Sequence, residues 1–294
     1  RRRLFVPTSG QFHGQAGSGV ADPSFGDNGT VGNWAFAFRA LRARNYRLFF
    51  IGQSVSLIGV WMMRVATSWL VYRLTGSSIL LGVVGFAGQI PTFLLGPVAG
   101  VLVDRWDRHR TLVVTQVFLM LQSLAMAGLT LAGVITPAQI ILLSVVQGVI
   151  NSVDMPARQA FVVQMVENRE DLGNAIALNS SMFNGARLAG PAIAGMVIAA
   201  VGEGVCFLLD GLSYVAVIGS LLAMKIQAAP PRSQRDLLVE IREGWRYVSG
   251  SLAIRSLLVM VAVISLFGMP YTVLMPVFAA NVLGGGPNTL GFLM

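Results

Sequence analysis

Four ionisable residues lie inside long apolar runs of the sequence: Arg64, Asp154, Arg187 and Asp210. Charge is costly in such surroundings, and ionisable groups that are kept there commonly bind a solute, carry protons or pair with one another. An aspartate between two arginines stays ionised in a dry site, and entry of water or of a solute would let it take up a proton. Arg64, Arg187 and Asp210 are therefore predicted to form one buried cluster that couples protons to a solute. A static ion pair that fixes helix packing is the alternative.

A second concentration of charge is the stretch 100–110, which reads GVLVDRWDRHR. Residues 78–103 before it contain no charged side chain, and neither do residues 111–150 after it. Each of these runs is long enough to cross the apolar core of a bilayer as a helix, which takes about 20 residues. The pattern predicts two membrane-spanning helices joined by a short charged loop.

This loop resembles the signature loop of the major facilitator superfamily of transporters, and five residues match that pattern: Gly100, Leu102, Asp104, Arg105 and Arg108. Asp107 stands where the family has glycine, and His109 stands where it has lysine or arginine. The resemblance implies an all-α integral membrane fold of two six-helix bundles. It also implies that Asp154 pairs with Arg108, in a charged latch with Asp104 and Arg105 that closes the cytoplasmic side. A solvated loop with one capping carboxylate is the alternative.

The stretch 186–195 resembles a packing motif of exporters in the same superfamily, and it matches at Gly190, Pro191 and Gly195. Small residues allow two helices to approach closely, and a proline kink is tolerated where neighbouring helices satisfy the freed carbonyl. Ser144 stands where exporters often carry an arginine, so a mechanism that depends on that arginine is not implied. The stretches 59–66, 154–161 and 187–191 resemble the branch of enterobactin-type siderophore exporters and macrolide efflux proteins.

The composition selects a polytopic membrane protein. Of 294 residues, 54% are hydrophobic and only 12% are charged, and the mean hydropathy is +0.69. A soluble domain has about a quarter of its residues charged. The net charge of +8 is explained by arginines in cytoplasmic loops, so no nucleic-acid partner is predicted. One cysteine, two histidines and no nucleophile beside a base predict no metal site, no cofactor and no enzymatic activity.

The apolar runs predict spans near residues 48–72, 78–102, 111–133, 137–157, 172–200, 204–225 and 256–280, with an eighth beginning at 287. Alternating these spans leaves only Arg73 in an outer loop, and all other loop arginines, with Lys225, fall on the inner side. The positive-inside rule then predicts a cytoplasmic N-terminus in a plasma membrane, such as a bacterial inner membrane.

The expected organisation has four parts. Residues 1–35 are polar and glycine-rich and are predicted to be a disordered cytoplasmic tail. Residues 36–225 are predicted to form the first six-helix bundle. Residues 226–255 are predicted to be a cytoplasmic linker with an interfacial helix, because Leu238, Ile241, Trp245 and Val248 share one helical face. Residues 256–294 would begin the second bundle, so the chain is expected to be a fragment that does not transport alone and whose complete form is a monomer.

Gln53 and Gln89 are polar residues within predicted spans and are candidates for lining a substrate cavity. The favoured function is proton-coupled export of a small amphiphilic compound, such as a drug or a siderophore, by alternating access. The alternatives are proton-coupled uptake of a small solute and a membrane scaffold or sensor that does not transport.

Overall fold

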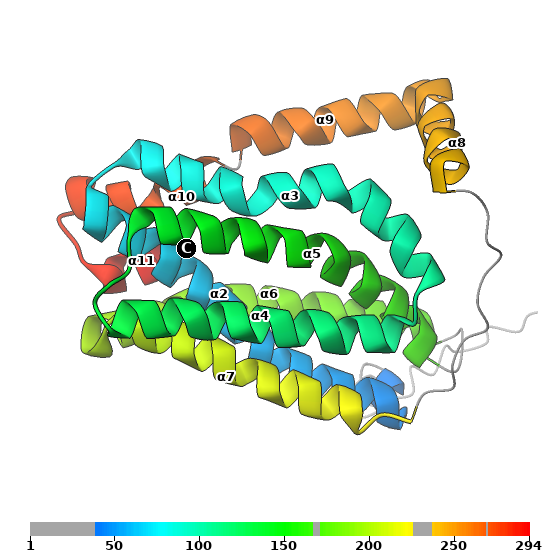
Figure 1. Cartoon of the computed structure of the whole chain (residues 1–294), viewed down its shortest axis with the longest axis horizontal. Helices are drawn as coiled ribbons and strands as arrows, with labels where there is room; N and C mark the ends of the chain where they lie inside the picture. The colour runs from blue at the N-terminus through cyan, green and yellow to red at the C-terminus, as the bar shows by residue number, and fades with distance from the viewer. Residues whose placement is uncertain (1–38, 167–170, 226–236, 269) are drawn as a thin grey trace, which may run out of the picture. The chain divides into compact units, whose positions relative to one another are not determined.

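A computed structural model of the chain describes residues 39–166, 171–225, 237–268 and 270–294, and helix is the only regular secondary structure among them (Figure 1). After a short 3₁₀ turn, Arg39–Arg42, six helices are long and apolar enough to cross a membrane: α2 (Arg44–Thr75), α3 (Ser78–Arg105), α4 (Arg108–Leu131), α5 (Pro137–Met165), α6 (Leu172–Val201) and α7 (Glu203–Leu222). The predicted all-α membrane class is confirmed.

Local capping explains where these helices begin. The Ser77 hydroxyl accepts a hydrogen bond from the backbone N–H of Leu80 at 3.3 Å, at the start of α3. Thr136 and Gln139 form a reciprocal capping box at the start of α5, with Pro137 in the first turn. Such caps satisfy N–H groups that have no partner within the helix. The α2 helix ends at Gly76, whose φ of +62° is the left-handed conformation that glycine adopts without strain.

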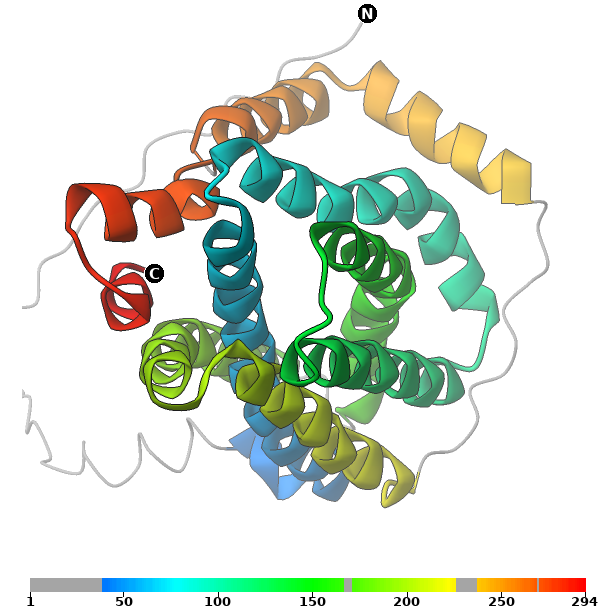
Figure 2. The ribbon, with the colours of Figure 1, turned by 60° about the vertical axis from the view of Figure 1, so that its left-hand side comes forward.

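The six long helices form two triplets, α2–α4 and α5–α7, that pack mainly on each other. The α3 helix packs on α5, and its counterpart α6 packs on α2; α2 packs on α7, and its counterpart α5 packs on α4. If α2, α3 and α4 are exchanged with α5, α6 and α7 in that order, each of these helix contacts becomes another contact of the same set. The contact between α4 and α7 becomes itself. Figure 2 shows α2 with α6 and α7 against it. This is the arrangement of an internal three-helix repeat.

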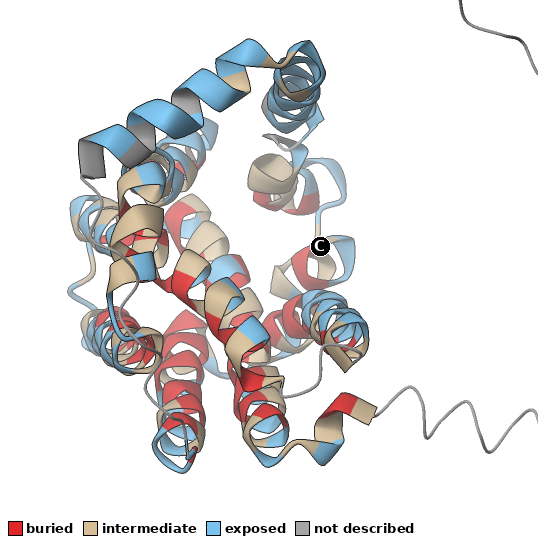
Figure 3. Cartoon of the chain, turned by 90° about the vertical axis from the view of Figure 1, so that its right-hand side faces the viewer, coloured by how far each residue is buried: buried red, intermediate tan, exposed pale blue. Residues whose placement is uncertain are grey.

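Buried side chains line the faces that the helices turn toward one another, whereas many outward faces carry exposed apolar residues (Figure 3). Near one end of the bundle, Phe49, Phe161 and Leu221 belong to one buried cluster. In the same cluster the Tyr46 hydroxyl donates a 2.8 Å hydrogen bond to the Ala175 carbonyl. Lipid can cover the outward apolar faces without a free-energy cost. The interior of this bundle therefore differs from its surface in how closely the side chains pack rather than in how apolar they are.

Beyond α7 the chain forms α8 (Leu237–Gly250), α9 (Leu252–Gly268), α10 (Pro270–Val277), a π-helical segment (Phe278–Val282) and α11 (Pro287–Leu293). The predicted seventh span, 256–280, covers most of α9, all of α10 and the start of the π-helical segment, and it stays a prediction because residue 269 lies outside the described residues.

The α8 helix occupies the region predicted to be the linker helix, and its position on a membrane surface stays a prediction. The side chains of Leu238, Ile241 and Trp245, the tail 1–35 and the linker segment 226–236 lie outside the described residues. Further along, α10 packs on α3 and α2, and α11 packs on α6. The Tyr72 hydroxyl donates a 2.8 Å hydrogen bond to Asn281 and links α2 to the π-helical segment.

Candidate substrate-facing site and signature loop

Two arginines from different helices meet around one tryptophan ring. The Cζ atom of Arg64, one turn beyond Trp61 on α2, lies 4.6 Å from the centroid of the Trp61 ring. The Cζ atom of Arg187 on α6 lies 5.8 Å from the same centroid. Phe183, one turn before Arg187, meets Trp61 edge to face with 5.7 Å between ring centroids. These four side chains are called the Trp61 site below.

The Trp61 site exists because α6 approaches α2 closely at Gly190. A Cβ atom at Gly190 would lie 2.5 Å from the Cβ of Trp61, so only glycine fits at this crossing. Gly190 thereby sets the distance between the two helices and brings Arg187, three residues earlier on α6, to the Trp61 ring.

Neither arginine of the Trp61 site has a carboxylate partner or a hydrogen bond among the described residues, and both side chains are exposed. A cation–π contact offsets only part of the free-energy cost of placing a charged side chain within a membrane span. The indole Nε1–H of Trp61 is buried and finds no acceptor within the described ranges either. The site therefore presents two positive charges and one free donor without an internal counter-charge.

Asp210 does not join these arginines, which corrects the predicted three-residue cluster. Its side chain is fully buried between α7 and α2, where a Cβ atom at Gly59 would lie 2.8 Å from its Oδ1. Gly59 and Arg64 are five residues apart on α2, which places them about 140° apart around the helix axis. Asp210 thus faces the interior of the bundle, while Arg64 faces away from it.

The buried carboxyl of Asp210 has no hydrogen-bond partner for either oxygen among the described residues. The nearby Ser123 hydroxyl donates instead to the Phe207 carbonyl, at 2.9 Å. Gln53, expected to line a cavity, is also in the core and only 2% exposed, whereas Gln89 on α3 is exposed. The predicted coupling and cavity residues are therefore divided between the bundle interior and its surface.

The signature loop joins α3 to α4. Within it, Arg108 pairs with Asp104 at 3.1 Å, and Asp107 caps α4 by accepting a 3.0 Å hydrogen bond from the backbone N–H of Arg110. The Leu102 carbonyl accepts from the Trp106 N–H at 3.1 Å, which ends α3. Gly100 and Arg105 belong to the last turns of α3, and a Cβ at Gly100 would meet no heavy atom within 4 Å.

Asp154 on α5 lies at the same end of the bundle but has other partners than predicted. The side chain is 1% exposed, and its Oδ1 accepts hydrogen bonds of 2.7 Å from Thr115 and from Gln116 on α4. Its Oδ2 is paired with Arg158, one turn further along α5. The predicted Asp154–Arg108 pair is therefore wrong in this structure, because Arg158 occupies the nearer position on the same helix face.

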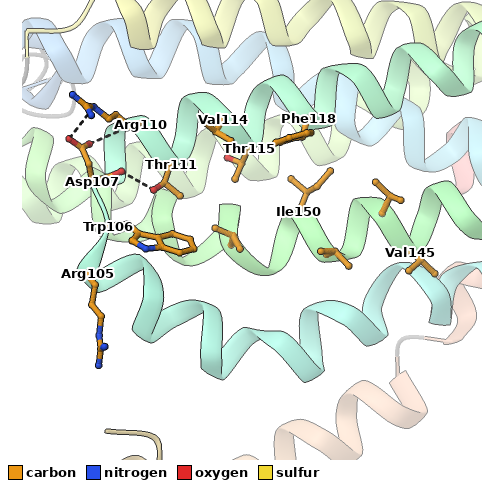
Figure 4. A pocket seen from close by; sticks show the side chains of 13 residues that line it. Arg105, Trp106, Asp107, Arg110, Thr111, Val114, Thr115, Phe118, Val145 and Ile150 are labelled. Carbon is orange, nitrogen blue, oxygen red and sulfur yellow. Dashed lines mark hydrogen bonds and ion pairs between the residues drawn. The ribbon is translucent and has the colours of Figure 1, made fainter. Parts of the chain in front are cut away.

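A groove of about 850 Å³ begins at the signature loop and runs between α4 and α5. Figure 4 shows Trp106 lying alongside it, Val114, Phe118 and Ile150 lining its length, and Arg105 pointing away from it. Apart from residues 105–111 at its end and Thr115, its lining is apolar. None of the four residues of the Trp61 site lines this groove.

The stretch 190–195 forms two close helix crossings. Gly190 packs against α2, as described above, and Gly195, five residues later, packs against α11. A Cβ atom at Gly195 would lie 2.7 Å from the Pro287 carbonyl oxygen, and one at Gly291 would lie 2.5 Å from the Pro191 carbonyl oxygen. This stretch therefore packs α11 against the six-helix bundle.

Comparison with known sequences identifies the family. Residues 35–294 match the profile of the "transmembrane secretion effector" family, which belongs to the major facilitator superfamily. The chain belongs to this transporter family.

Curated relatives are similar at low identity. The staphyloferrin A transporter of Staphylococcus aureus is 27% identical over 84% of this chain and 62% of its own length. The multidrug efflux pump Tap of Mycolicibacterium fortuitum is 26% identical over 78% and 58%. The macrolide efflux protein A of Streptococcus pyogenes is 21% identical over 87% and 62%. The transporter chain described here thus spans about 60% of the length of these relatives.

Three polar contacts of the transporter were not anticipated from its sequence. Arg73 and Glu203 form a two-pronged ion pair at the end opposite the signature loop, with distances of 2.7 and 3.1 Å. His109 Nε2 lies 2.8 Å from the Leu221 carbonyl and joins α4 to α7. The Asp154–Arg158 pair had a visible signal, since residues four apart share a helix face. The other two join residues more than 100 positions apart, which no local pattern reveals.

Proposed function

We propose that this protein is part of a secondary transporter that exports a small amphiphilic compound in exchange for protons, by alternating access. The observation that carries the proposal is the Trp61 site. Two charged and two aromatic side chains are held together within membrane-spanning helices without an internal counter-charge, an arrangement suited to binding a solute. A scaffold that holds only a partner helix would have no need to keep two unpaired charges at that depth.

Asp210 is the proposed site of proton coupling. Its carboxyl is fully buried and neither oxygen accepts a hydrogen bond from the described residues, so a negative charge there is costly and proton binding removes the cost. Because Asp210 packs on α2 at Gly59, gain or loss of its proton would act on the helix that also carries Trp61 and Arg64. The coupling in this proposal therefore passes through α2 rather than through direct contact of Asp210 with the substrate.

The signature-loop end is proposed to be the cytoplasmic gate, with the N-terminus on the same side. Alternating access needs contacts that are made in one state and broken in the other. The proposed gate residues are Gly100, Leu102, Asp104, Arg105, Arg108 and Asp154. The Asp104–Arg108 pair is at the surface and can break at low cost, whereas Asp154 is buried and positions α4 against α5.

Export, rather than uptake, is supported by the names of two relatives, the multidrug efflux pump Tap and the macrolide efflux protein A. The test uses the protein expressed with its whole natural coding region and reconstituted in liposomes that contain a pH-sensitive dye. A panel of drugs and siderophores is added, and solute and proton movements are recorded together. Opposite movements of solute and protons are expected; movement in the same direction would instead indicate uptake, and no solute movement would contradict transport of these classes.

Asp210→Asn is the variant that tests coupling, and Glu203→Gln is its matched control. Both carboxylates belong to α7 and are buried, but that of Glu203 is already paired with Arg73. Proton movement driven by solute should disappear in Asp210→Asn and persist in Glu203→Gln. Normal proton movement in Asp210→Asn would remove Asp210 from the coupling mechanism.

A further inference from the structure

The chemistry of the Trp61 site restricts which solute it can accept. We propose that the transporter binds an amphiphilic anion there, with a carboxylate or other oxyanion group held by Arg64 and Arg187 and an aromatic or apolar body lying against Trp61 and Phe183. The inference rests on the proposed function in one respect only, namely that the site receives a solute. It names a substrate class of opposite charge to the cationic amphiphiles that a site of aromatic side chains alone would favour.

The first argument is charge balance. Each guanidinium lies within 6 Å of the same ring centroid, and the two positive charges also act on each other. No carboxylate among the described residues pairs with either one, and Asp210 packs on α2 at Gly59, about 140° around the helix axis from Arg64. Two like charges without a counter-ion in a membrane span are unfavourable, and a bound anion would relieve both the repulsion and the unmet hydrogen-bonding capacity.

The second argument is the geometry of donors around an apolar body. An arginine side chain offers a planar fork of N–H donors that matches a carboxylate or phosphate group. The Trp61 Nε1–H adds a buried donor that has no acceptor in the part of the chain that the structure describes. Phe183 stands edge-on to Trp61, so a ring surface lies next to the donors. A ligand with an oxyanion at one end and an apolar body at the other satisfies both features.

The third argument is depth. Arg187 lies at the middle of α6, about 22 Å from either end of the helix at 1.5 Å per residue. An arginine that is present only to anchor a helix to lipid headgroups lies near a helix end, where it can reach the interface. Arg187 is too far from both ends for that, so the anchoring role does not explain it.

The fourth argument is exclusion. A cation placed against Trp61 would lie within a few ångströms of two guanidinium groups, and like-charge contact at that distance outweighs an exposed cation–π attraction of about 0.5–1 kcal/mol. The same ring that would attract a cation in isolation is thus already occupied by arginine. The site discriminates by repulsion as well as by attraction.

Binding is tested without transport, using two probes that share one aromatic body and differ in charge. The protein, expressed with its whole natural coding region, is placed in lipid nanodiscs of neutral lipid. Equilibrium dialysis then measures binding of 2-naphthaleneacetate and of 2-(2-naphthyl)ethylamine. We expect saturable binding of the acid and at least tenfold weaker binding of the amine. Equal or tighter binding of the amine would overturn the inference, as expected if a carboxylate outside the described residues neutralises the arginines.

Variants assign the binding to the two arginines. Arg64→Gln and Arg187→Gln should each weaken binding of the acid at least tenfold, Arg64→Lys and Arg187→Lys should retain most of it, and Arg110→Gln should leave it unchanged. Arg110 is the matched control because it is an arginine 86% exposed at the start of α4, outside the site. Unchanged binding in both glutamine variants would overturn the inference; should they fail to fold, the acid–amine comparison on the unaltered protein still decides it.

The binding and export measurements together distinguish failure of the anion-site inference from failure of the proposed export function. Tight binding of the acid by a protein that does not export solutes would support the anion site and contradict export. Export of cationic compounds, with no binding of the acid, would support export and overturn the anion site.

Discussion

Asp154 forms its ion pair with Arg158, one turn along α5, while Arg108 pairs with Asp104 across the turn that joins α3 to α4. The two pairs differ in surroundings. Asp154 is buried and also bonded to α4, whereas the Asp104 side chain is 55% exposed. The charged end of the bundle thus contains one interior pair that fixes helix packing and one surface pair that can open.

Removing Arg158 should destabilise the protein, because it leaves the Asp154 carboxylate buried without its cation. Removing one partner of a buried ion pair costs about 3–5 kcal/mol of folding free energy. Because Arg158 is partly exposed, we expect a cost near the lower value, about 3 kcal/mol. We expect Arg158→Met to lower the melting temperature of the detergent-purified protein. Adding Asp154→Asn to that variant should restore much of the loss; a double variant as unstable as the single one would show that the charge is not the cause.

Opening of the surface pair should affect transport more than stability. An exposed ion pair contributes no more than about 1 kcal/mol, so Arg108→Ala and Asp104→Asn should insert and fold normally. If the proposed gate is correct, both should reduce solute transport severalfold in liposomes. Arg110→Ala is the control on the same loop, and a loss of transport equal to that of Arg108→Ala would argue against a specific gate.

The crossing of α6 and α11 should tolerate no side chain at Gly291. A methyl group there would meet the Pro191 carbonyl oxygen at 2.5 Å, and overpacking of this kind costs about 1–3 kcal/mol. We expect Gly291→Ala to lower the melting temperature and to impair transport. Gly185→Ala is the control, because a Cβ at Gly185 on α6 would meet no heavy atom within 4 Å. Equal melting temperatures for the two variants would contradict close packing at this crossing.

The ion pair at the opposite end should respond asymmetrically to mutation. Glu203 is buried and Arg73 is 54% exposed, so Arg73→Ala leaves a carboxylate without its partner, while Glu203→Gln leaves an arginine that water can solvate. Arg73→Ala should therefore cost about 1–3 kcal/mol more than Glu203→Gln. Chemical unfolding of the two variants measures the difference, and equal costs would show that Glu203 is hydrated in the folded protein.

The spans could be predicted closely because membrane solvation imposes a pattern on the sequence itself. Apolar length and the breaks at Gly76, Pro137 and Gly202 specify α2–α7 locally, through capping and through the need to satisfy every backbone group in lipid.

The partners of the charged residues could not be predicted in the same way. Which face of α2 meets α7 depends on Gly52 and Gly59, where only the absence of a side chain permits contact. That choice of face separates Asp210 from Arg64 and places Arg187 beside Trp61. A one-dimensional pattern gives the depth of a charge in the membrane but not its direction around the helix, and this direction decides that Asp210 does not meet Arg64.

The exchange of contacts between the two triplets has a consequence for biogenesis. Since α2–α4 pack mainly on α5–α7 and little on themselves, a ribosome that has delivered only the first three spans has delivered helices with almost no partners. Those spans must remain soluble in lipid as separate helices until the next three arrive. Tertiary packing therefore cannot form until all six spans are in the membrane. Cleavage in the loop at 132–136 should leave two pieces whose helices do not pack stably within either piece, but which assemble when both are in one membrane.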